Sequence, residues 1–169
     1  MGETKNLVNR QAIKKVQELA MEVDIAMFCT KLSAKPFNVC PMSTQQVEDN
    51  GTIWFFSGKG SDHNADIKAD PYVQLIYSSK VGDSNHLSVY GRAEITFDRA
   101  KAEELFTPMT KVWFPEGVDD PNLTMIKFTP ESGYYWDTKH GKMVAFAKMA
   151  ASVVTGTTMD DGVKGELKL

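Results

Sequence analysis

The chain has 169 residues, of which 42% are hydrophobic and 24% charged, and its formal net charge at pH 7 is −3. This length and composition are typical of one globular domain, spanning 1–169, that buries its own hydrophobic core. The acidic balance and the absence of any block of Lys or Arg exclude nucleic-acid binding driven by phosphate neutralisation. No segment is long and apolar enough to span a membrane, so we expect no membrane partner and a cytoplasmic location.

Residues 7–23 repeat apolar side chains at helical spacing, which predicts an amphipathic N-terminal helix that packs on the rest of the domain. Six short runs rich in β-branched and aromatic residues follow, and turn sequences join several of them as hairpins. We therefore predict a mainly β fold with peripheral helices, in which an antiparallel sheet curls into a barrel. Its six strands are expected at 25–32, 37–44, 52–57, 73–79, 86–97 and 123–129.

Three further helices are expected at the periphery of this sheet. The first covers about 62–69 with Ser61 as its N-cap, and the second covers 99–106 with Asp98 as its N-cap. The third spans about 142–154, where apolar side chains share one helical face.

The loop at residues 57–63, SGKGSDH, combines several features that favour an anion. Ser57 and Ser61 supply hydroxyl groups, Lys59 supplies a positive charge, and a helix begins at Asp62. A helix N-terminus with free backbone N–H groups and a nearby cation is a favourable place for a phosphate. The alternative is that Ser61 only caps the helix after a Gly-rich turn, and the negative charge of Asp62 favours that alternative.

The run TIWFFS at 52–57 has bulky apolar side chains on both faces, which predicts a central, covered strand. We expect the turn at Asn50 and Gly51 to place residues 40–44, CPMST, beside it. Pro41 has no backbone N–H, so the strand is irregular there and nearby groups can face a ligand. The two segments together can line a slot for a flat heterocycle, although such an aromatic strand is also a common core element.

The remaining patterns point away from metal or nucleophile chemistry. The three histidines show no metal-binding spacing, and the acidic segment 115–122 is typical of a solvated turn. The first hairpin sets Cys29 opposite Cys40; a cross-strand disulfide is one outcome and two free thiols, which a reducing cytosol favours, the other. No Ser-His-Asp arrangement is visible, so any reaction here depends on a cofactor.

Taken together, six segments resemble the general stress protein branch of the pyridoxamine 5'-phosphate oxidase-like, FMN-binding split barrels. These segments are CPMS, GTIWFFSGKGS, ADPYVQLIYS, SVYGRAEI, WFPEGVDDPNL and PESGYYWD, and the resemblance covers about residues 8–137. It implies a homodimer of six-stranded split β-barrels with a flavin, FMN or alternatively FAD, in each of two clefts between the subunits. The resemblance therefore favours the ligand-binding interpretation of both the loop at 57–63 and the aromatic strand at 52–57.

The resemblance also implies which residues surround the flavin. The ring would lie along 40–44, nearest Met42 and Ser43, with Trp136 of YYWD beside it. His86 would come from the second subunit, and Trp113 of WFPEG is either a cleft residue or an interface residue. The positions that would surround the ribityl phosphate are Phe56, Ser57, Lys59, Ser61, Asp62 and His63.

The chain departs from the vitamin B6 oxidases of this family. The two positions after the loop serine, usually basic in those oxidases, are Asp62 and His63 here, so Lys59 would carry the charge that meets the phosphate. Their substrate-holding Arg-x-His is replaced by residues 142–144, of which Lys142 is a candidate for the substrate side. We therefore do not expect pyridoxamine phosphate oxidation.

The predicted function is that of an FMN-binding, stress-related protein that acts as a flavin-dependent oxidoreductase on an unassigned substrate. One alternative is a non-catalytic flavin-binding or stress-protective module. Another is a split barrel that binds a different cofactor, such as a deazaflavin or haem.

Overall fold

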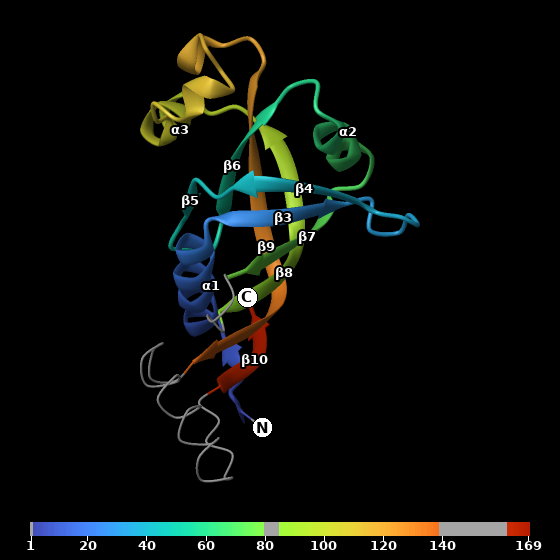
Figure 1. Cartoon of the computed structure of the whole chain (residues 1–169), viewed down its shortest axis with the longest axis vertical. Coiled ribbons are helices and arrows are strands. Elements are labelled where there is room, and N and C mark those ends of the chain that lie inside the picture. Colours follow the sequence, from blue (N-terminus) through green and yellow to red (C-terminus); the bar gives the residue numbers. More distant parts are fainter. Residues whose placement is uncertain (1, 80–84, 139–161) are drawn as a thin grey trace, which may run out of the picture.

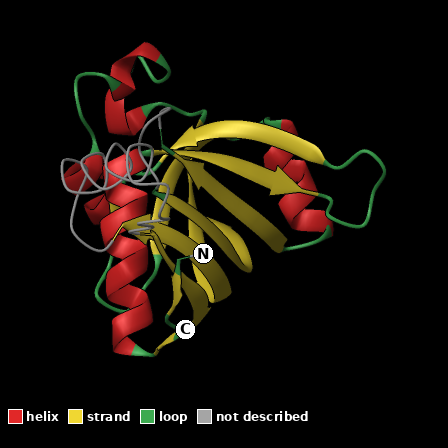
Figure 2. Ribbon diagram, turned by 60° about the horizontal axis from the view of Figure 1, so that its bottom comes forward, coloured by secondary structure: helices red, strands yellow, loops and turns green. Residues whose placement is uncertain are grey.

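The computed structural model describes residues 2–79, 85–138 and 162–169 (Figure 1). The helix expected at about 142–154 and its Lys142 lie outside these residues, as does most of the loop expected at 81–85. A strongly curved sheet forms the body of the molecule, and a long helix lies against one side of it (Figure 2).

Each of the six predicted strands is present. In hydrogen-bonding order they run β4-β3-β7-β8-β9-β6, and every neighbouring pair is antiparallel. The prediction of a mainly β, antiparallel core is therefore confirmed. The bounds are β3 (Ile25–Thr30), β4 (Asn38–Ser43), β6 (Ile53–Gly58), β7 (Tyr72–Ser78), β8 (His86–Thr96) and β9 (Leu123–Thr138).

The barrel has an open seam. Within the described part of the chain no ladder joins β4 to β6, the strands at the two ends of this order. The sheet therefore curls round without a described hydrogen-bond ladder between its two end strands, and the edge of β6 away from β9 is paired only at Ile53 and Trp54, by β5.

Four strands were not predicted, so the sheet has ten strands rather than six within the described residues. Three of them, β1 (Glu3–Thr4), β2 (Leu7–Val8) and β5 (Gln46–Val47), have two residues each, too few for a visible alternation of burial. The fourth, β10 (Gly162–Lys168), pairs antiparallel with β9 and parallel with both β1 and β2. The sheet is thus mixed at this end.

The strand β9 is much longer than expected because it continues through a stretch that contains Pro130 and Gly133. A register shift at Tyr90 and Gly91 of β8 accommodates this stretch. A Cβ atom at Gly91 would overlap the carbonyl oxygen of Thr129, so the close approach of β8 and β9 there depends on glycine.

Helix α1 (Arg10–Val23) starts three residues later than expected, because Leu7 and Val8 pair with β10 instead. It buries Ala12, Val16, Leu19 and Ala20 in the main core. Beside this buried face, Lys15 Nζ lies 2.8 Å from a carboxylate oxygen of Asp137 in β9. This contact fastens the helix to the longest strand.

The prediction that 52–57 is a covered central strand is confirmed. Ile53 and Phe55 of β6 belong to the main core, whereas Trp54 packs on the other face with Met125 and Ala102. Ala102 lies in α3 (Arg99–Leu105), which covers that second face. Strand β6 thus separates two apolar layers.

The two short helices start at the predicted caps. Ser61 accepts a hydrogen bond from the backbone N–H of Asn64 at the start of α2 (Asp62–Ala69), and Asp98 accepts one from Lys101 in α3. After α3 the chain forms two 3₁₀ turns, Thr110–Val112 and, within the acidic segment 115–122, Gly117–Asp119. Figure 1 shows α3 and these turns at one end of the molecule.

Candidate functional site

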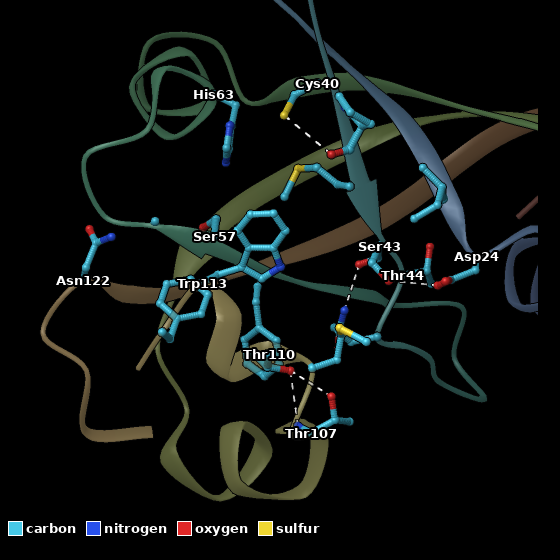
Figure 3. Close-up of a pocket in the computed structure, with 18 residues that line it drawn as sticks. Asp24, Cys40, Ser43, Thr44, Ser57, His63, Thr107, Thr110, Trp113 and Asn122 are labelled. Carbon is cyan, nitrogen blue, oxygen red and sulfur yellow. Dashed lines mark hydrogen bonds between the residues drawn. The ribbon is translucent and has the colours of Figure 1, made fainter. Parts of the chain in front are cut away.

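A cavity of about 820 Å³ lies at the open seam between β4 and β6 (Figure 3). This volume lies within the range of cofactor and small-molecule sites. Three segments supply most of the wall: the end of β4 with the residues that follow it, the end of β6, and the turns after α3. The lining residues are Asp24, Ile25, Cys40, Pro41, Met42, Ser43, Thr44, Gln45, Phe56, Ser57, Gly58, His63, Thr107, Met109, Thr110, Trp113, Phe114 and Asn122.

Strand β4 forms one wall, but by a different pairing from the one expected. We expected residues 40–44 to pair with 52–57, and this is wrong: β4 pairs with β3, with Met42 opposite Ala26. The tight turn closed by the Gly51 N–H on the Glu48 carbonyl pairs only the two residues of β5 with β6. One edge of β4 therefore lacks a ladder partner in the described residues, and its backbone groups can face a ligand.

At the end of β4 the hydroxyl of Ser43 donates to Asp24 Oδ1 at 2.9 Å. Asp24 follows α1 with a φ of 67° and donates its backbone N–H to Ala20. Asp24 was not among the site residues predicted from the sequence. The only indication in the sequence was its position just after the helical pattern, where residues with a positive φ are common. Next to it the Thr44 and Tyr77 hydroxyls lie 2.9 Å apart, and burial raises the pKa of Tyr77 well above its usual value.

The loop after β6 forms the opposite end of the cavity. The buried hydroxyl of Ser57 lies 2.8 Å from Thr124 Oγ1, and Lys59 donates its backbone N–H to the carbonyl of Asn122. The side chain of Lys59 is exposed and lies outside the cavity wall, as do Ser61 and Asp62. The sequence left two roles open for Ser61, helix capping alone or anion binding as well. The capping role is confirmed, and the hydroxyl also lies at the helix N-terminus where an anion would bind.

His63 lines the cavity from the first turn of α2. Its Nε2 lies 3.0 Å from the Ser61 hydroxyl, and its ring stands 6.5 Å from that of Phe28. Burial lowers the pKa of His63 below its usual value, although the charges of Asp66 and Asp62 oppose this effect. Burial therefore favours the uncharged form of the ring.

Two buried polar side chains of α2 hold this end of the cavity in place, and both were missed from sequence. Asn64 donates to the carbonyl of Gly58 at 2.9 Å and to Thr124 Oγ1 at 3.0 Å. Asp66 accepts hydrogen bonds from Thr30 and Asn38, both at 2.7 Å, and pairs with Lys31 at 2.8 Å. The only indication in the sequence was that both polar residues fall on the face of the helix that packs towards the sheet.

The ionisation of Asp66 follows from these contacts. Burial alone would raise the pKa of this carboxyl, but hydrogen bonds from Lys31, Thr30 and Asn38 outweigh burial and hold the pKa at about 2. The carboxylate is thus charged at neutral pH and ties α2 to β3 and β4.

Aromatic and thioether groups form the outer part of the wall. Phe56 packs edge-on against Phe106 and Phe114, with ring centroids 5.9 and 6.5 Å apart. Trp113 and Met109 are 72% and 74% exposed although they line the cavity, so they stand at its mouth. Figure 3 shows Trp113 among the side chains that surround the cavity.

The structure brings six of the predicted site residues to this cavity, leaves Lys59, Ser61 and Asp62 on the adjoining loop outside its wall, and places His86 and Trp136 elsewhere. The six are Met42, Ser43, Phe56, Ser57, His63 and Trp113. His86 and Trp136 are cross-strand partners on β8 and β9, away from the cavity wall of the same chain. His86 Nδ1 lies 3.1 Å from the Ser78 hydroxyl, and Trp136 packs on Tyr134 at 4.7 Å.

The cysteine register expected from the sequence is wrong by one residue. Cys29 lies opposite Val39, and Cys40 lies opposite Phe28, so adjacent positions of the two strands carry the thiols on different faces. Both are free, and burial raises the pKa of each. Among the described residues there is no group of three His, Cys, Asp or Glu side chains suited to a metal, and no helix that could cross a membrane.

A curved, mostly antiparallel sheet with an open seam and an aromatic-walled cavity in that seam defines a split β-barrel. The chain belongs to the pyridoxamine 5'-phosphate oxidase-like family, whose model matches residues 11–160. The family predicted from the sequence segments is thereby confirmed. No curated protein matches the chain.

Several solved structures share this fold. A candidate general stress protein 26 from Jannaschia sp. CCS1 is 27% identical, with a TM-score of 0.77 over 92% of this chain and 97% of the other. A general stress FMN/FAD binding protein from Xanthomonas citri is 24% identical, with a TM-score of 0.66 over 79% of this chain and 93% of the other. A Clostridium acetobutylicum protein related to general stress protein 26 is 24% identical, with a TM-score of 0.63 over 75% and 89%.

Proposed function

We propose that the protein binds FMN in the seam cavity and acts as a flavin-dependent oxidoreductase. The observation that carries this proposal is the division of the cavity into an apolar part, lined by Met42, Phe56 and Trp113, and a hydroxyl-lined end beside the N-terminus of α2. A flat heterocycle with a phosphate on a chain requires both parts. The similar Xanthomonas citri protein, described as FMN/FAD binding, supports the same cofactor class.

In the proposed complex the ring lies along the free edge of β4, beside Met42 and Ser43. Ser57 and the N-terminus of α2 face the phosphate, with Ser61 and the exposed Lys59 as the nearest hydroxyl and cation on that loop. The negative charge of Asp62 repels the phosphate, and the positive charge of Lys59 compensates for this repulsion. FAD is the alternative cofactor, since the rim beside Lys59 is open to solvent.

When bound, the flavin supplies hydride transfer. Backbone donors on the free edge of β4 would hold and polarise the ring edge, and the apolar wall would exclude water from it. The substrate stays unassigned, and a cytoplasmic location remains a prediction.

We further propose that the functional unit is a homodimer. The uncovered face of the sheet carries exposed apolar side chains from three adjacent strands: Ile25 and Met27, Val39, and Ile76. Ile25 also lines the cavity, so this apolar face continues into the cavity wall. A second copy packed on it would bury the patch, close the cavity and bring its own His86 and Trp136 towards the ring.

The test is to purify the protein, release any bound chromophore and identify it, and then to titrate the flavin-free protein with FMN. A yellow protein that takes up one FMN per chain is expected. A colourless protein that ignores FMN would contradict the cofactor assignment and favour another ligand, such as a deazaflavin or haem.

A non-catalytic flavin-binding module is the second candidate. It is favoured by the arrangement of the described cavity wall, in which no hydrogen bond joins Asp24 to His63: Asp24 is bonded to Ser43 and His63 to Ser61. Reduction of the bound flavin by NADH, NADPH or another donor separates the two candidates. No reduction by any donor would leave only the binding module.

A further inference from the structure

The end of the cavity beside the N-terminus of α2 has few side-chain hydrogen-bond donors to spare. The Thr124 hydroxyl donates to the Ser57 carbonyl at 3.0 Å and accepts from Asn64 Nδ2 at 3.0 Å. A hydroxyl has one proton, so in the 2.8 Å contact between Thr124 and Ser57 the Ser57 hydroxyl is the donor. The proton of Ser57 is therefore committed inside the protein and cannot be donated to an anion.

Asn122, which was not among the site residues predicted from the sequence, supplies a free donor at this end. Its side chain lines the cavity and makes no hydrogen bond within the described residues. Figure 3 shows Asn122 with Ser57 and His63 on the side of the cavity away from Asp24. The two N–H groups of its amide can therefore meet a ligand at this end.

The backbone of Asn122 is held on both sides. Its N–H donates to Asp120 Oδ1 at 3.0 Å, and its carbonyl accepts the N–H of Lys59 at 2.8 Å. Lys59 and Asn122 are thus neighbours, one with a positive charge and the other with a neutral N–H donor. The carboxylate of Asp120 adds a negative charge close by, so an anion here depends on both donors.

The amide of Asn122 packs on Gly58. A Cβ atom at Gly58 would lie 3.3 Å from Nδ2 of Asn122, whereas one at Gly60 would meet nothing within 4 Å. The carbonyl of Gly58 accepts the N–H of Ser61, the N-cap of α2, at 3.0 Å. The amide of Asn122 therefore stands beside the loop at which the proposed function puts the phosphate.

We propose that Asn122 is a ligand of the flavin phosphate, with Nδ2 donating to a phosphate oxygen. This inference rests on the proposed function. An N–H donor and an anionic oxygen form a charge-assisted hydrogen bond. Riboflavin has the same ring and chain without the phosphate and cannot form this bond, so Asn122 makes the cavity prefer FMN to riboflavin.

The test compares FMN with riboflavin on the flavin-free protein, with dissociation constants measured at pH 7.5 from the quenching of flavin fluorescence. Asn122→Ala should weaken FMN binding by about tenfold or more and leave riboflavin within about twofold of wild type. Asn122→Asp has nearly the same shape but carries a negative charge in place of the donor, so it should weaken FMN further. Asn50→Asp makes the same change at an exposed turn outside the cavity wall, keeps an oxygen for the Thr52 N–H, and should alter neither flavin.

A second pair of variants uses the space beside the amide. Gly58→Ala should displace the amide and lower the preference for FMN, while Gly60→Ala should leave it unchanged. In a protein that already carries Asn122→Ala, the change Gly58→Ala should not lower the preference further. The phosphorus NMR resonance of bound FMN is an independent readout, and it should move in Asn122→Ala and not in Asn50→Asp.

The inference is overturned if Asn122→Ala keeps the wild-type preference for FMN. It is also overturned if Asn122→Ala weakens FMN and riboflavin alike, because the side chain would then shape the cavity without contacting the phosphate. Either result, obtained with a wild-type protein that binds FMN, leaves the proposed function intact. A wild-type protein that binds neither flavin contradicts the proposed function instead.

Discussion

The hydroxyl oxygen of Ser61 lies 3.0 Å from Nε2 of His63 while it accepts the backbone N–H of Asn64. One oxygen thus caps α2 and fixes the ring that lines the cavity. Ser61→Ala should lower the free energy of unfolding by about 1 kcal/mol, the usual cost of losing an N-cap, and should also weaken FMN binding. Urea unfolding and FMN titration measure the two effects.

A matched control for this change is Asp98→Ala, which removes the N-cap of α3 at a distance from the proposed phosphate end. It should cost similar stability and leave FMN affinity unchanged. If both variants weaken FMN binding equally, the effect of Ser61 is on folding alone.

Lys59 is the cation that the proposed phosphate site depends on. Its side chain is exposed at the loop between β6 and α2, while its backbone is held by Asn122. Lys59→Ala should weaken FMN binding by about 1–3 kcal/mol, the range for losing a charge-assisted hydrogen bond, and reduce the salt dependence of binding. The control Lys68→Ala, at the other end of α2, should change neither the FMN affinity nor its salt dependence. If wild type and Lys59→Ala bind FMN with equal affinity, Lys59 is not part of the phosphate site.

Asp66 should make the protein sensitive to acid. Its pKa is about 2 in the folded chain against an ordinary value of 3.8, because Lys31, Thr30 and Asn38 favour the charged form over the effect of burial. The lowered pKa stabilises the fold at pH values above the ordinary one, and this contribution is lost as pH falls from about 5 to 2. Its size is on the order of 2 kcal/mol.

Unfolding in urea at a series of pH values measures this loss. Asp66→Asn should be less stable at pH 7 and should show a flatter decline below pH 5. A decline as steep as that of the wild type would assign the acid sensitivity to other carboxyl groups.

The proposed homodimer predicts the effect of a charge on the exposed sheet face. Met27 lies opposite both Pro41 and Ile76 in the centre of that face. Met27→Glu should convert the dimer into a monomer and weaken FMN binding, because the second copy's His86 and Trp136 would be lost from the cleft. Light scattering measures the mass of the particle in solution. The control is Met21→Glu on α1, which should leave the mass unchanged. A wild-type protein that is monomeric and still binds FMN fully would contradict the shared cleft.

Much of the fold could be predicted because the long strands are bounded by strong turn signals. The covered strand β6 and the caps Ser61 and Asp98 follow from local chemistry. The short strands and the pairing of β4 could not be predicted, since two-residue strands carry no alternation and pairing is a property of distant segments. The same reason explains the one-residue error in the register of Cys29.

The site residues show the same difference between features set by local sequence and features set by distant segments. Residues on motifs of known spacing, such as Ser57 and His63, could be placed from sequence, whereas Asp24, Asn64 and Asp66 could not. A lone polar residue in a helix or at its end looks the same whether it faces water or a cavity. Only the packed chain shows that Asp24 meets Ser43 across the end of the sheet.

The pairing of β10 with both β1 and β2 has a consequence for the order of folding. Within the described residues β1 and β2 pair only with β10, and a Cβ atom at Gly165 would overlap the carbonyl of Lys5, so the fit is tight. These ladders join segments more than 150 residues apart in sequence, whereas β7, β8 and β9 pair with near neighbours. Because loop closure over so long a separation costs more entropy, we expect this end of the sheet to form after the local hairpins.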